Sequence, residues 1–352
     1  MEKRALETLR KLVMTPSAPK DDKREVVEIV LRPLEKLGFQ CEIIGEPDCP
    51  ALLASKGKGG VILSGHLDTV PLGEGWTHKQ GDIQGTLLFG RGSCDMKGGC
   101  AAMMITAEEL AHTDVPLVLA FTTDEEHKMK GAGFIAKREE VAAAPGVIVC
   151  EPTDLKLGLR EKGLLQVKLT ALGRSAHAAM PCEGENAVHK MISALEKLRP
   201  LASDSDDPSQ SLTLSISVMQ GGEKVNVIPN SCVAEIDIRA PSDRFPADIL
   251  ATLRALLADA GVEVHVINRL DPVVISEDSE AVMSVRKLRP GIGNIDIAYA
   301  TELVKFGERN RNLLVMGPGD PKYCHRADEL IDVRDVAEAA GLYTAVCRDM
   351  TG

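Results

Sequence analysis

Short, continuously apolar stretches alternate with helical stretches in the first 160 residues of the chain. Leu117–Thr122 and Val147–Cys150 are apolar runs of strand length, and Met96–Leu110 has helical spacing. Strands that are apolar throughout are typical of a parallel sheet covered by helices on both faces. The sequence therefore predicts an α/β fold with a mostly parallel central sheet. Further helices are expected at 2–12, 22–37, 279–287 and 333–347, and further strands at 41–44, 61–63 and 312–316.

The pattern changes after about residue 160. Leu165–Ala171 and Val233–Arg239 alternate apolar and polar residues, as strands with one wet face do. Helical stretches at Ala187–Leu198 and Pro246–Ala258 lie between such strands. These features indicate a small α+β insert.

We therefore predict two domains. Residues 1–160 and 271–352 would form the main α/β domain, and residues 161–270 would form the insert. Within the insert, the polar segment 202–211 is expected to be an exposed loop.

The composition excludes several classes of function. The 352 residues carry a formal net charge of -11 and no basic stripe, which argues against nucleic acid or anionic membrane partners. The apolar runs are too short to span a bilayer, and the first residues have no apolar signal core. Nine cysteines without a CxxC pair favour reduced thiols in a cytoplasmic protein over a disulfide framework.

Acidic residues and histidines follow the predicted strands. The motifs are SGHLDTVP (64–71), GRGSCDMKGG (90–99), TTDEE (122–126), CEPTD (150–154) and, near the end of the chain, YCHRADE (323–329). In open α/β sheets, ligands bind beyond the carboxyl ends of the strands. We therefore expect one cluster at this edge, formed by His66, Asp68, Asp95, Glu125, Glu126 and Glu151.

Carboxylates crowded at one edge repel each other unless a cation lies among them. A mixture of imidazole and carboxylate suits zinc, cobalt or manganese better than calcium or magnesium. Two such metals need a bridging carboxylate, and one further carboxylate can serve as general base. His66 and Asp68 are spaced to share one face of a strand, so Asp68 is a candidate to orient the imidazole.

Other interpretations of these residues stay open at this point. Cys94, Cys150 and Cys324 each neighbour a proposed ligand, and a thiolate binds zinc well. Adjacent side chains of a strand face opposite ways, so Cys150 is expected in the core if Glu151 faces the metal. Without the other motifs, TTDEE would be interpreted as a solvent-exposed acidic loop. The remaining histidines are interpreted as surface or helix residues: His78, His112, His127, His189 and His265.

Together, the five motifs resemble those of the co-catalytic zinc amidohydrolases and carboxypeptidases. This family includes acetylornithine deacetylase, succinyl-diaminopimelate desuccinylase, aminoacylase and glutamate carboxypeptidase. The resemblance covers essentially the whole chain and implies two divalent metal ions, zinc or cobalt. The implied roles are His66 and Glu151 at one metal, Glu126 and His325 at the other, Asp95 as the bridge, Asp68 as the residue orienting His66, and Glu125 as the base that activates a metal-bound water. It also implies a cis peptide bond between Asp95 and Met96.

The insert resembles the same family. GRSAHAAMPCEGENAV (173–188) is similar to the lid and dimerisation segment, which implies a ferredoxin-like lid, a homodimer and a His177 that reaches across the dimer to the oxyanion. KVNVIPN and EIDIRA are similar to substrate-facing segments. Asn226 and Arg239 would then bind the carboxylate of the amino acid, for which the forked guanidinium of arginine is suited.

The expected reaction is hydrolysis of the amide bond of a small N-acyl amino acid. IAYATELVKF (297–306) resembles a segment of acetylornithine and acetyl-lysine deacetylases, in which Glu302 would attract the distal ammonium group. Desuccinylase, aminoacylase, dipeptidase and carboxypeptidase activities are the alternatives within the family. A non-catalytic relative that binds amino acids and an enzyme that uses a single metal are further alternatives.

Overall fold

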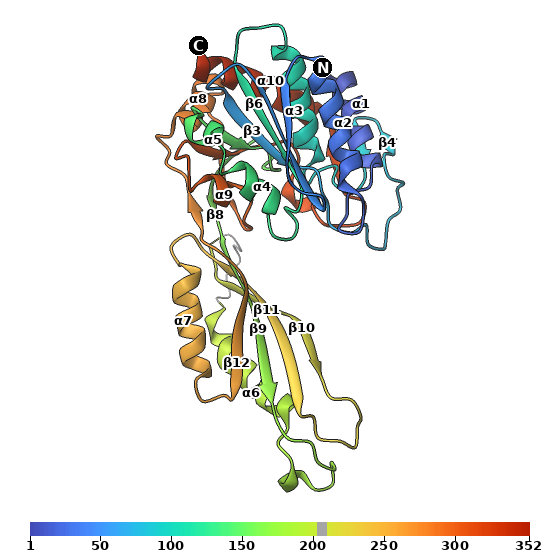
Figure 1. Cartoon of the computed structure of the whole chain (residues 1–352), viewed down its shortest axis with the longest axis vertical. Coiled ribbons are helices and arrows are strands. Elements are labelled where there is room, and N and C mark those ends of the chain that lie inside the picture. Colours follow the sequence, from blue (N-terminus) through green and yellow to red (C-terminus); the bar gives the residue numbers. More distant parts are fainter. Residues whose placement is uncertain (203–209) are drawn as a thin grey trace. The chain divides into compact units, whose positions relative to one another are not determined.

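The structure, a computed structural model, describes residues 1–202 and 210–352 and divides into two compact units (Figure 1). The first unit comprises Met1–Leu159, Ile275–Ile295 and Thr301–Gly352. The second comprises Arg160–Val274 and Asp296–Ala300. The segment 202–211, expected to be an exposed loop, lies mostly outside the described residues.

A largely parallel sheet forms the centre of the first unit. Its strands, in spatial order, are β1 (Gln40–Glu46), β2 (Cys49–Lys56), β6 (Leu117–Thr122), β3 (Val61–His66), β7 (Val147–Val149), β15 (Leu313–Val315) and β8 (Leu157–Glu161). The four strands from β6 to β15 run parallel to one another, and β1, β2 and β8 pair antiparallel with the strands beside them. Every residue of β3 and β6 is buried, so both faces of these strands are covered.

Helices cover this sheet. They are α1 (Glu2–Met14), α2 (Lys23–Lys36), α3 (Lys97–Leu110), α4 (Lys130–Ile135), α5 (Glu139–Ala143), α8 (Glu280–Leu288), α9 (Leu303–Phe306) and α10 (Val333–Thr351). Figure 1 shows α1, α2 and α3 side by side, and α3, which is almost wholly buried, also packs against α10. A small antiparallel sheet of β4 (Ile83–Gln84), β5 (Leu87–Phe89) and β16 (Leu330–Asp332) completes the unit.

The second unit is a four-stranded antiparallel sheet with two helices. The strand order is β10 (Thr213–Gly221), β11 (Ser231–Ala240), β9 (Gly163–Leu172) and β12 (Val262–Leu270). Helices α6 (Ala187–Leu198) and α7 (Pro246–Leu257) pack on the sheet and form a separate core that includes Val167, Met191 and Leu253. The remaining elements of the described residues are the short strands β13 (Val273–Val274) and β14 (Asn294–Ile297), which both pair with β8 in the central sheet, and short 3-10 turns at Pro181–Glu183, Arg199–Leu201 and Pro321–Tyr323.

The predicted fold class, a mostly parallel α/β sheet with a separate α+β part, is confirmed. The helices and strands that the sequence predicted begin and end within a few residues of the expected positions, and the structure adds further elements, among them β2, β10 and β12. For example, Asp22 caps α2 by accepting from the backbone N–H of Arg24, and Gly38 follows the helix with a φ of 84°. Within the described part of the chain, no helix combines the length and apolar character needed to cross a membrane.

Candidate metal centre

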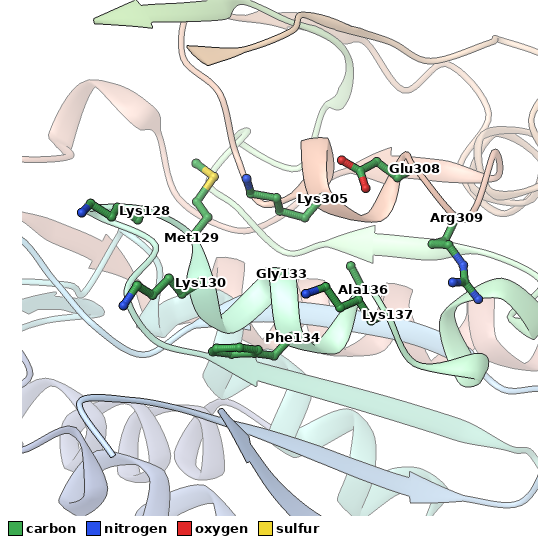
Figure 2. Close-up of a pocket in the computed structure, with 10 residues that line it drawn as sticks. All are labelled: Lys128, Met129, Lys130, Gly133, Phe134, Ala136, Lys137, Lys305, Glu308 and Arg309. Carbon is green, nitrogen blue, oxygen red and sulfur yellow. The ribbon is translucent and has the colours of Figure 1, made fainter. Parts of the chain in front are cut away.

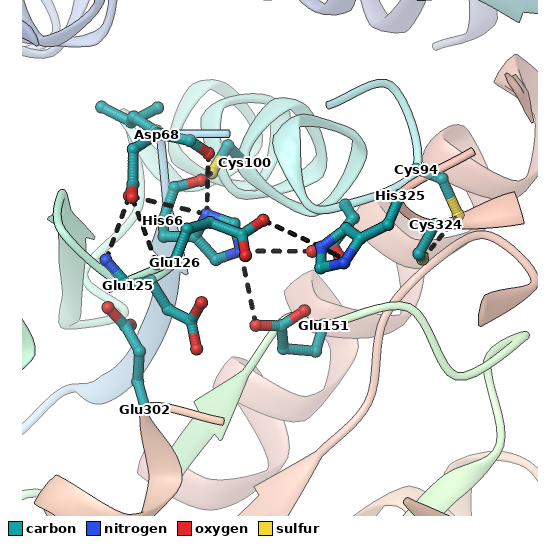
Figure 3. A network of polar contacts seen from close by, with 12 residues as sticks. His66, Asp68, Cys94, Cys100, Glu125, Glu126, Glu151, Glu302, Cys324 and His325 are labelled. Carbon is teal, nitrogen blue, oxygen red and sulfur yellow. Dashed lines mark hydrogen bonds and ion pairs between the residues drawn. The ribbon is translucent and has the colours of Figure 1, made fainter. Parts of the chain in front are cut away.

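Four segments that follow neighbouring strands bring their acidic residues and histidines together in the first unit. His66 ends β3, Glu125 and Glu126 follow β6, and Glu151 follows β7 (Figure 3). Asp95 precedes α3, and His325 lies in the loop after β15. The carboxyl ends of the parallel strands therefore supply most of the cluster, in keeping with the rule for open α/β sheets.

Asp95 lies between two histidines. Its Oδ1 is 3.2 Å from Nε2 of His66, and its Oδ2 is 3.1 Å from Nε2 of His325. Glu151 Oε1 is 3.6 Å from the same nitrogen of His66, and Glu126 Oε1 is 3.0 Å from that of His325. The result is two groups, each with one imidazole and one glutamate, that share a single aspartate, and the donor atoms of each group lie within 4.8 Å of one another. This donor set fits two divalent transition metals.

The titration behaviour of the cluster shows why it needs a cation. Burial raises the pKa of Glu125 and of Glu151 well above the usual range, and neighbouring carboxylates raise both further. Hydrogen bonds to Asp95 and Glu126 raise the pKa of His325 to about 10. Without a metal, the carboxylates are thus stabilised by protons on the carboxyl groups and on the imidazoles. A bound cation would take the place of those protons.

His66 is oriented by the backbone of Asp68. Its Nδ1 is 2.9 Å from the carbonyl oxygen of Asp68 and 3.7 Å from the nearer carboxylate oxygen. A carbonyl only accepts, so Nδ1 carries a proton, and Nε2 faces Asp95 and Glu151. Without a metal, Nε2 donates a second proton to Asp95, and a cation that displaced this proton would meet the lone pair of Nε2. The carboxylate of Asp68 instead accepts from the backbone N–H groups of Glu125 and Glu126, at 3.3 and 3.2 Å. Asp68 therefore fixes both the imidazole and the loop that carries the two glutamates.

A buried ion pair holds the backbone of Asp95. Oε1 of Glu329 accepts from the backbone N–H groups of Cys94 and Asp95, both at 3.0 Å, and its Oε2 lies 2.7 Å from Nη1 of Arg91. The side chain of Glu329 is 0% exposed and that of Arg91 is 9% exposed. Sequence reasoning missed this pair, although both residues lie inside the recognised motifs. The peptide bond between Asp95 and Met96 is cis, as the family resemblance implied.

No cysteine belongs to the groups of metal-ligating atoms that include His66 or Asp95, among the residues described. Cys94 and Cys324 pair with each other instead, with their sulfur atoms 3.8 Å apart (Figure 3). Cys150 is buried and directs its thiol at the carbonyl of Ile148. The interpretation of these cysteines as metal ligands therefore gains no support.

Glu302 lies beneath the cluster. Its carboxylate accepts from the hydroxyl groups of Ser64 and Thr122, and the side chain is fully buried. Burial raises its pKa to about 7. Because the side chain is fully buried, an ammonium group of a substrate would not reach the carboxylate of Glu302 in this conformation.

The other predicted substrate residues belong to the second unit. His177 is exposed, and its segment pairs with Val227, next to Asn226 in the neighbouring loop. Arg239, on β11, is half-buried and forms an ion pair with Asp237 at 2.7 Å. The structure thus brings the segments of His177 and Asn226 together, while Arg239 already has a carboxylate partner.

Two glycines pack against the backbone that precedes Glu151. A Cβ atom on Gly99, in α3, would lie 2.1 Å from the carbonyl oxygen of Cys150, and one on Gly317 would lie 2.2 Å from the same atom. Neither distance is sterically allowed, and backbone atoms cannot yield as a flexible side chain does. These glycines therefore fix where Glu151 enters the cluster.

Gly99→Ala is expected to lower metal affinity about 10–100-fold, the effect typical of losing a contact that supports a ligand. A competition titration with a zinc-sensitive dye measures this. The matched control is Gly341→Ala in α10, where the added methyl group meets no atom within 4 Å. The control should keep its metal affinity and gain up to about 1 kcal/mol of stability from better helix propensity. Unchanged metal affinity in Gly99→Ala would contradict this account of Glu151.

Comparisons with known proteins agree with this geometry. Residues 62–349 match the model of peptidase family M20/M25/M40. The acetylornithine deacetylase of Proteus mirabilis is 32% identical, over 93% of this chain and 92% of that protein. A probable succinyl-diaminopimelate desuccinylase of Staphylococcus epidermidis is 26% identical, over 88% and 89%.

Solved structures show the same fold. The aminopeptidase PepT of Bacillus cereus superimposes with a TM-score of 0.80 at 17% identity, covering 100% of this chain and 99% of that one. A metallo-carboxypeptidase of the M20 family from Sulfolobus solfataricus gives 0.77 at 17% identity, covering 99% of both chains. The family match and both structural alignments cover the segments that form the cluster. The chain is therefore a hydrolase that belongs to peptidase family M20/M25/M40.

Proposed function

We propose that this protein hydrolyses the amide bond of an N-acyl amino acid at a pair of divalent metal ions, zinc or cobalt. The observation that carries the proposal is the position of Asp95, whose two carboxylate oxygens each face a different histidine. His66 and Glu151 would hold one ion, Glu126 and His325 the other, and Asp95 both. When bound, the two ions would polarise the acyl carbonyl and lower the pKa of water toward about 7.

Glu125 is proposed as the general base. Its carboxylate points into the cluster beside Glu151 (Figure 3). Glu125 would accept a proton from water as the oxygen attacks the acyl carbon. It would then give that proton to the nitrogen as the carbon–nitrogen bond breaks, which leaves a carboxylic acid and a free amine. Burial raises the pKa of Glu125, and carboxyl groups with raised pKa values are common among residues that transfer protons in active sites.

The second unit is proposed to bind the substrate and to form a homodimer. Asn226 and Arg239 would bind the carboxylate of the amino acid, and the partner subunit's His177 would donate to the oxyanion. Ile216 and Met219 support the dimer because they are 48% and 46% exposed on β10, which is an edge strand. Exposed apolar side chains on a strand edge are typical of an association surface.

N-acetyl-ornithine and N-acetyl-lysine are the proposed substrates. Two observations support this choice. Acetylornithine deacetylases are about 28–32% identical to this chain, and the segment that contains Glu302 resembles one found in such deacetylases. Succinyl-diaminopimelate is the second candidate, because a probable desuccinylase aligns over a similar share of the chain.

A substrate panel tests the proposal. Protein with added zinc or cobalt is offered N-acetyl-ornithine, N-acetyl-lysine, N-succinyl-diaminopimelate and dipeptides. We expect the highest kcat/KM for an N-acetyl diamino acid, at least about tenfold above the others, because a missing polar contact is strongly discriminated against. Chelator-treated protein should lose the activity and regain it when metal is returned. Highest activity on the succinyl compound or a dipeptide would replace the substrate assignment, and activity that survives chelation would overturn the proposed metal centre.

A further inference from the structure

A pocket with a volume of about 430 Å³ lies in the first unit, between α4 and α9 and the residues that flank them (Figure 2). None of the proposed metal ligands lines it. It is large enough for a small organic molecule.

Positive charge dominates the pocket. Five basic side chains line it, from Lys128, Lys130, Lys137, Lys305 and Arg309, against a single acidic one, from Glu308. The chain as a whole has a net charge of -11, so this local excess of cations is not a product of composition. Like charges gathered around one depression repel each other unless an anion offsets them.

Only part of this charge is neutralised by the protein. Lys130 pairs with Glu46 at 3.0 Å, and Arg309 lies 3.7 Å from Glu139. Within residues 1–202 and 210–352, no carboxylate oxygen lies within 4.0 Å of the amino groups of Lys128, Lys137 or Lys305. Three ammonium groups are therefore available for a ligand.

The wall of the pocket is apolar. Met129 and Ala136 are buried, and the ring of Phe134 packs so closely on β1 that a Cβ atom on Gly45 would lie 2.9 Å from it. A rigid ring beside a cationic rim accommodates a ligand with both an organic body and several negative charges. A simple ion would leave most of the volume unused.

We propose that this pocket binds a polyvalent oxyanion, either an organic polyphosphate or a polycarboxylate. Ammonium groups bind phosphate and carboxylate oxygens alike, so the lysines alone do not distinguish these two sources. The site does not depend on the identity of the amide substrate.

The site is coupled through the backbone to the loop that carries Glu125. The carbonyl of Asp124 accepts from the N–H groups of Lys128 and Met129, at 3.0 and 2.6 Å. Glu125 and Glu126 thus lie in the same short turn as the lysine at the rim of the pocket. An anion held there would restrain this turn.

Calorimetric titration of the full, metal-loaded chain tests the proposal. The probes are inorganic pyrophosphate, adenosine diphosphate and tricarballylate, with metal content measured before and after each titration to exclude chelation. We expect saturable binding of at least one probe that weakens as salt is raised, because exposed charges are screened. A preference for adenosine diphosphate or pyrophosphate would identify a phosphate ligand, and a preference for tricarballylate a carboxylate ligand.

Charge-reversal variants locate the binding. Lys137→Glu with Lys305→Glu should weaken binding at least tenfold, and Lys137→Gln with Lys305→Gln should have a smaller effect in the same direction. Lys20→Glu with Lys58→Glu makes the same change in net charge at exposed lysines outside the pocket and should leave binding unchanged. Absence of binding by the unmodified chain, or equal weakening in the control pair, would overturn the proposal.

Discussion

Glu125→Gln is expected to lower kcat about 10²–10⁴-fold while two metal ions per chain remain bound. The amide has nearly the shape of the carboxylate but cannot take a proton from water or return one to the leaving nitrogen. The proposed ligand sets do not include Glu125, although its carboxylate also lies near His66 and Glu126, and glutamine keeps one side-chain oxygen, so metal affinity should change little. Turnover and metal content, measured on the same preparation, separate the two effects.

Glu126→Gln is the matched comparison, since it makes the same chemical change at the next residue. Its Oε1 lies 3.0 Å from Nε2 of His325, so this variant should lose one metal ion along with activity. If Glu125→Gln lost the metal and Glu126→Gln kept both ions, the roles of the two glutamates would be exchanged. Full activity in Glu125→Gln would exclude it as the base.

Arg91→Ala is expected to destabilise the protein by about 3–5 kcal/mol, because it leaves the charge of Glu329 buried without its partner. Nη1 of Arg91 lies 2.7 Å from Oε2 of Glu329, whose side chain is 0% exposed. Arg91 also donates to the carbonyl groups of Pro71 and Leu72. Urea denaturation measures the loss, and metal affinity should fall as well, because Glu329 holds the backbone of Asp95.

Arg24→Ala provides the control for this prediction. Arg24 forms an equally short ion pair with Asp22, at 2.6 Å, but both side chains are exposed to solvent. Exposed pairs contribute little, so we expect no measurable change in stability. A loss in Arg91→Ala no larger than that of the control would mean that Glu329 is held by other contacts.

The sequence predicted the sheet because burial on both faces leaves a strong signal. β6 (Leu117–Thr122) is apolar at nearly every position, and its observed bounds equal the expected ones. The strand-end rule then placed His66, Glu126 and Glu151 at one edge without any knowledge of distances. Three strands were missed. In β2 (Cys49–Lys56), a proline and burial on both faces remove the alternation, whereas β10 and β12 do alternate, in TLSISV and VEVHV, and could have been recognised.

Contacts between segments that are far apart in the chain could not be predicted from the sequence. Glu329 meets the backbone of Asp95, and Glu302 meets Ser64, across sequence separations of 234 and 238 residues. No local pattern marks an acidic residue as the partner of a backbone N–H group far away in the chain. The orientation of His66 by the carbonyl of Asp68 also required the structure, because the two-residue spacing does not tell whether the carbonyl or the carboxylate of Asp68 accepts.

The insertion of the second unit also sets an order of assembly. The chain leaves the first unit after Leu159 and returns to it at Ile275, and β15 and His325 follow later still. During synthesis, the second unit is almost complete, with its own core, before the last strand and the last histidine of the cluster exist. The ribosome must therefore release nearly the whole chain before the group of Asp95, Glu126 and His325 can close, whereas His66, Asp95 and Glu151 all precede the second unit. The two metal sites thus become complete at different stages of synthesis, and the site that contains His325 is the later one.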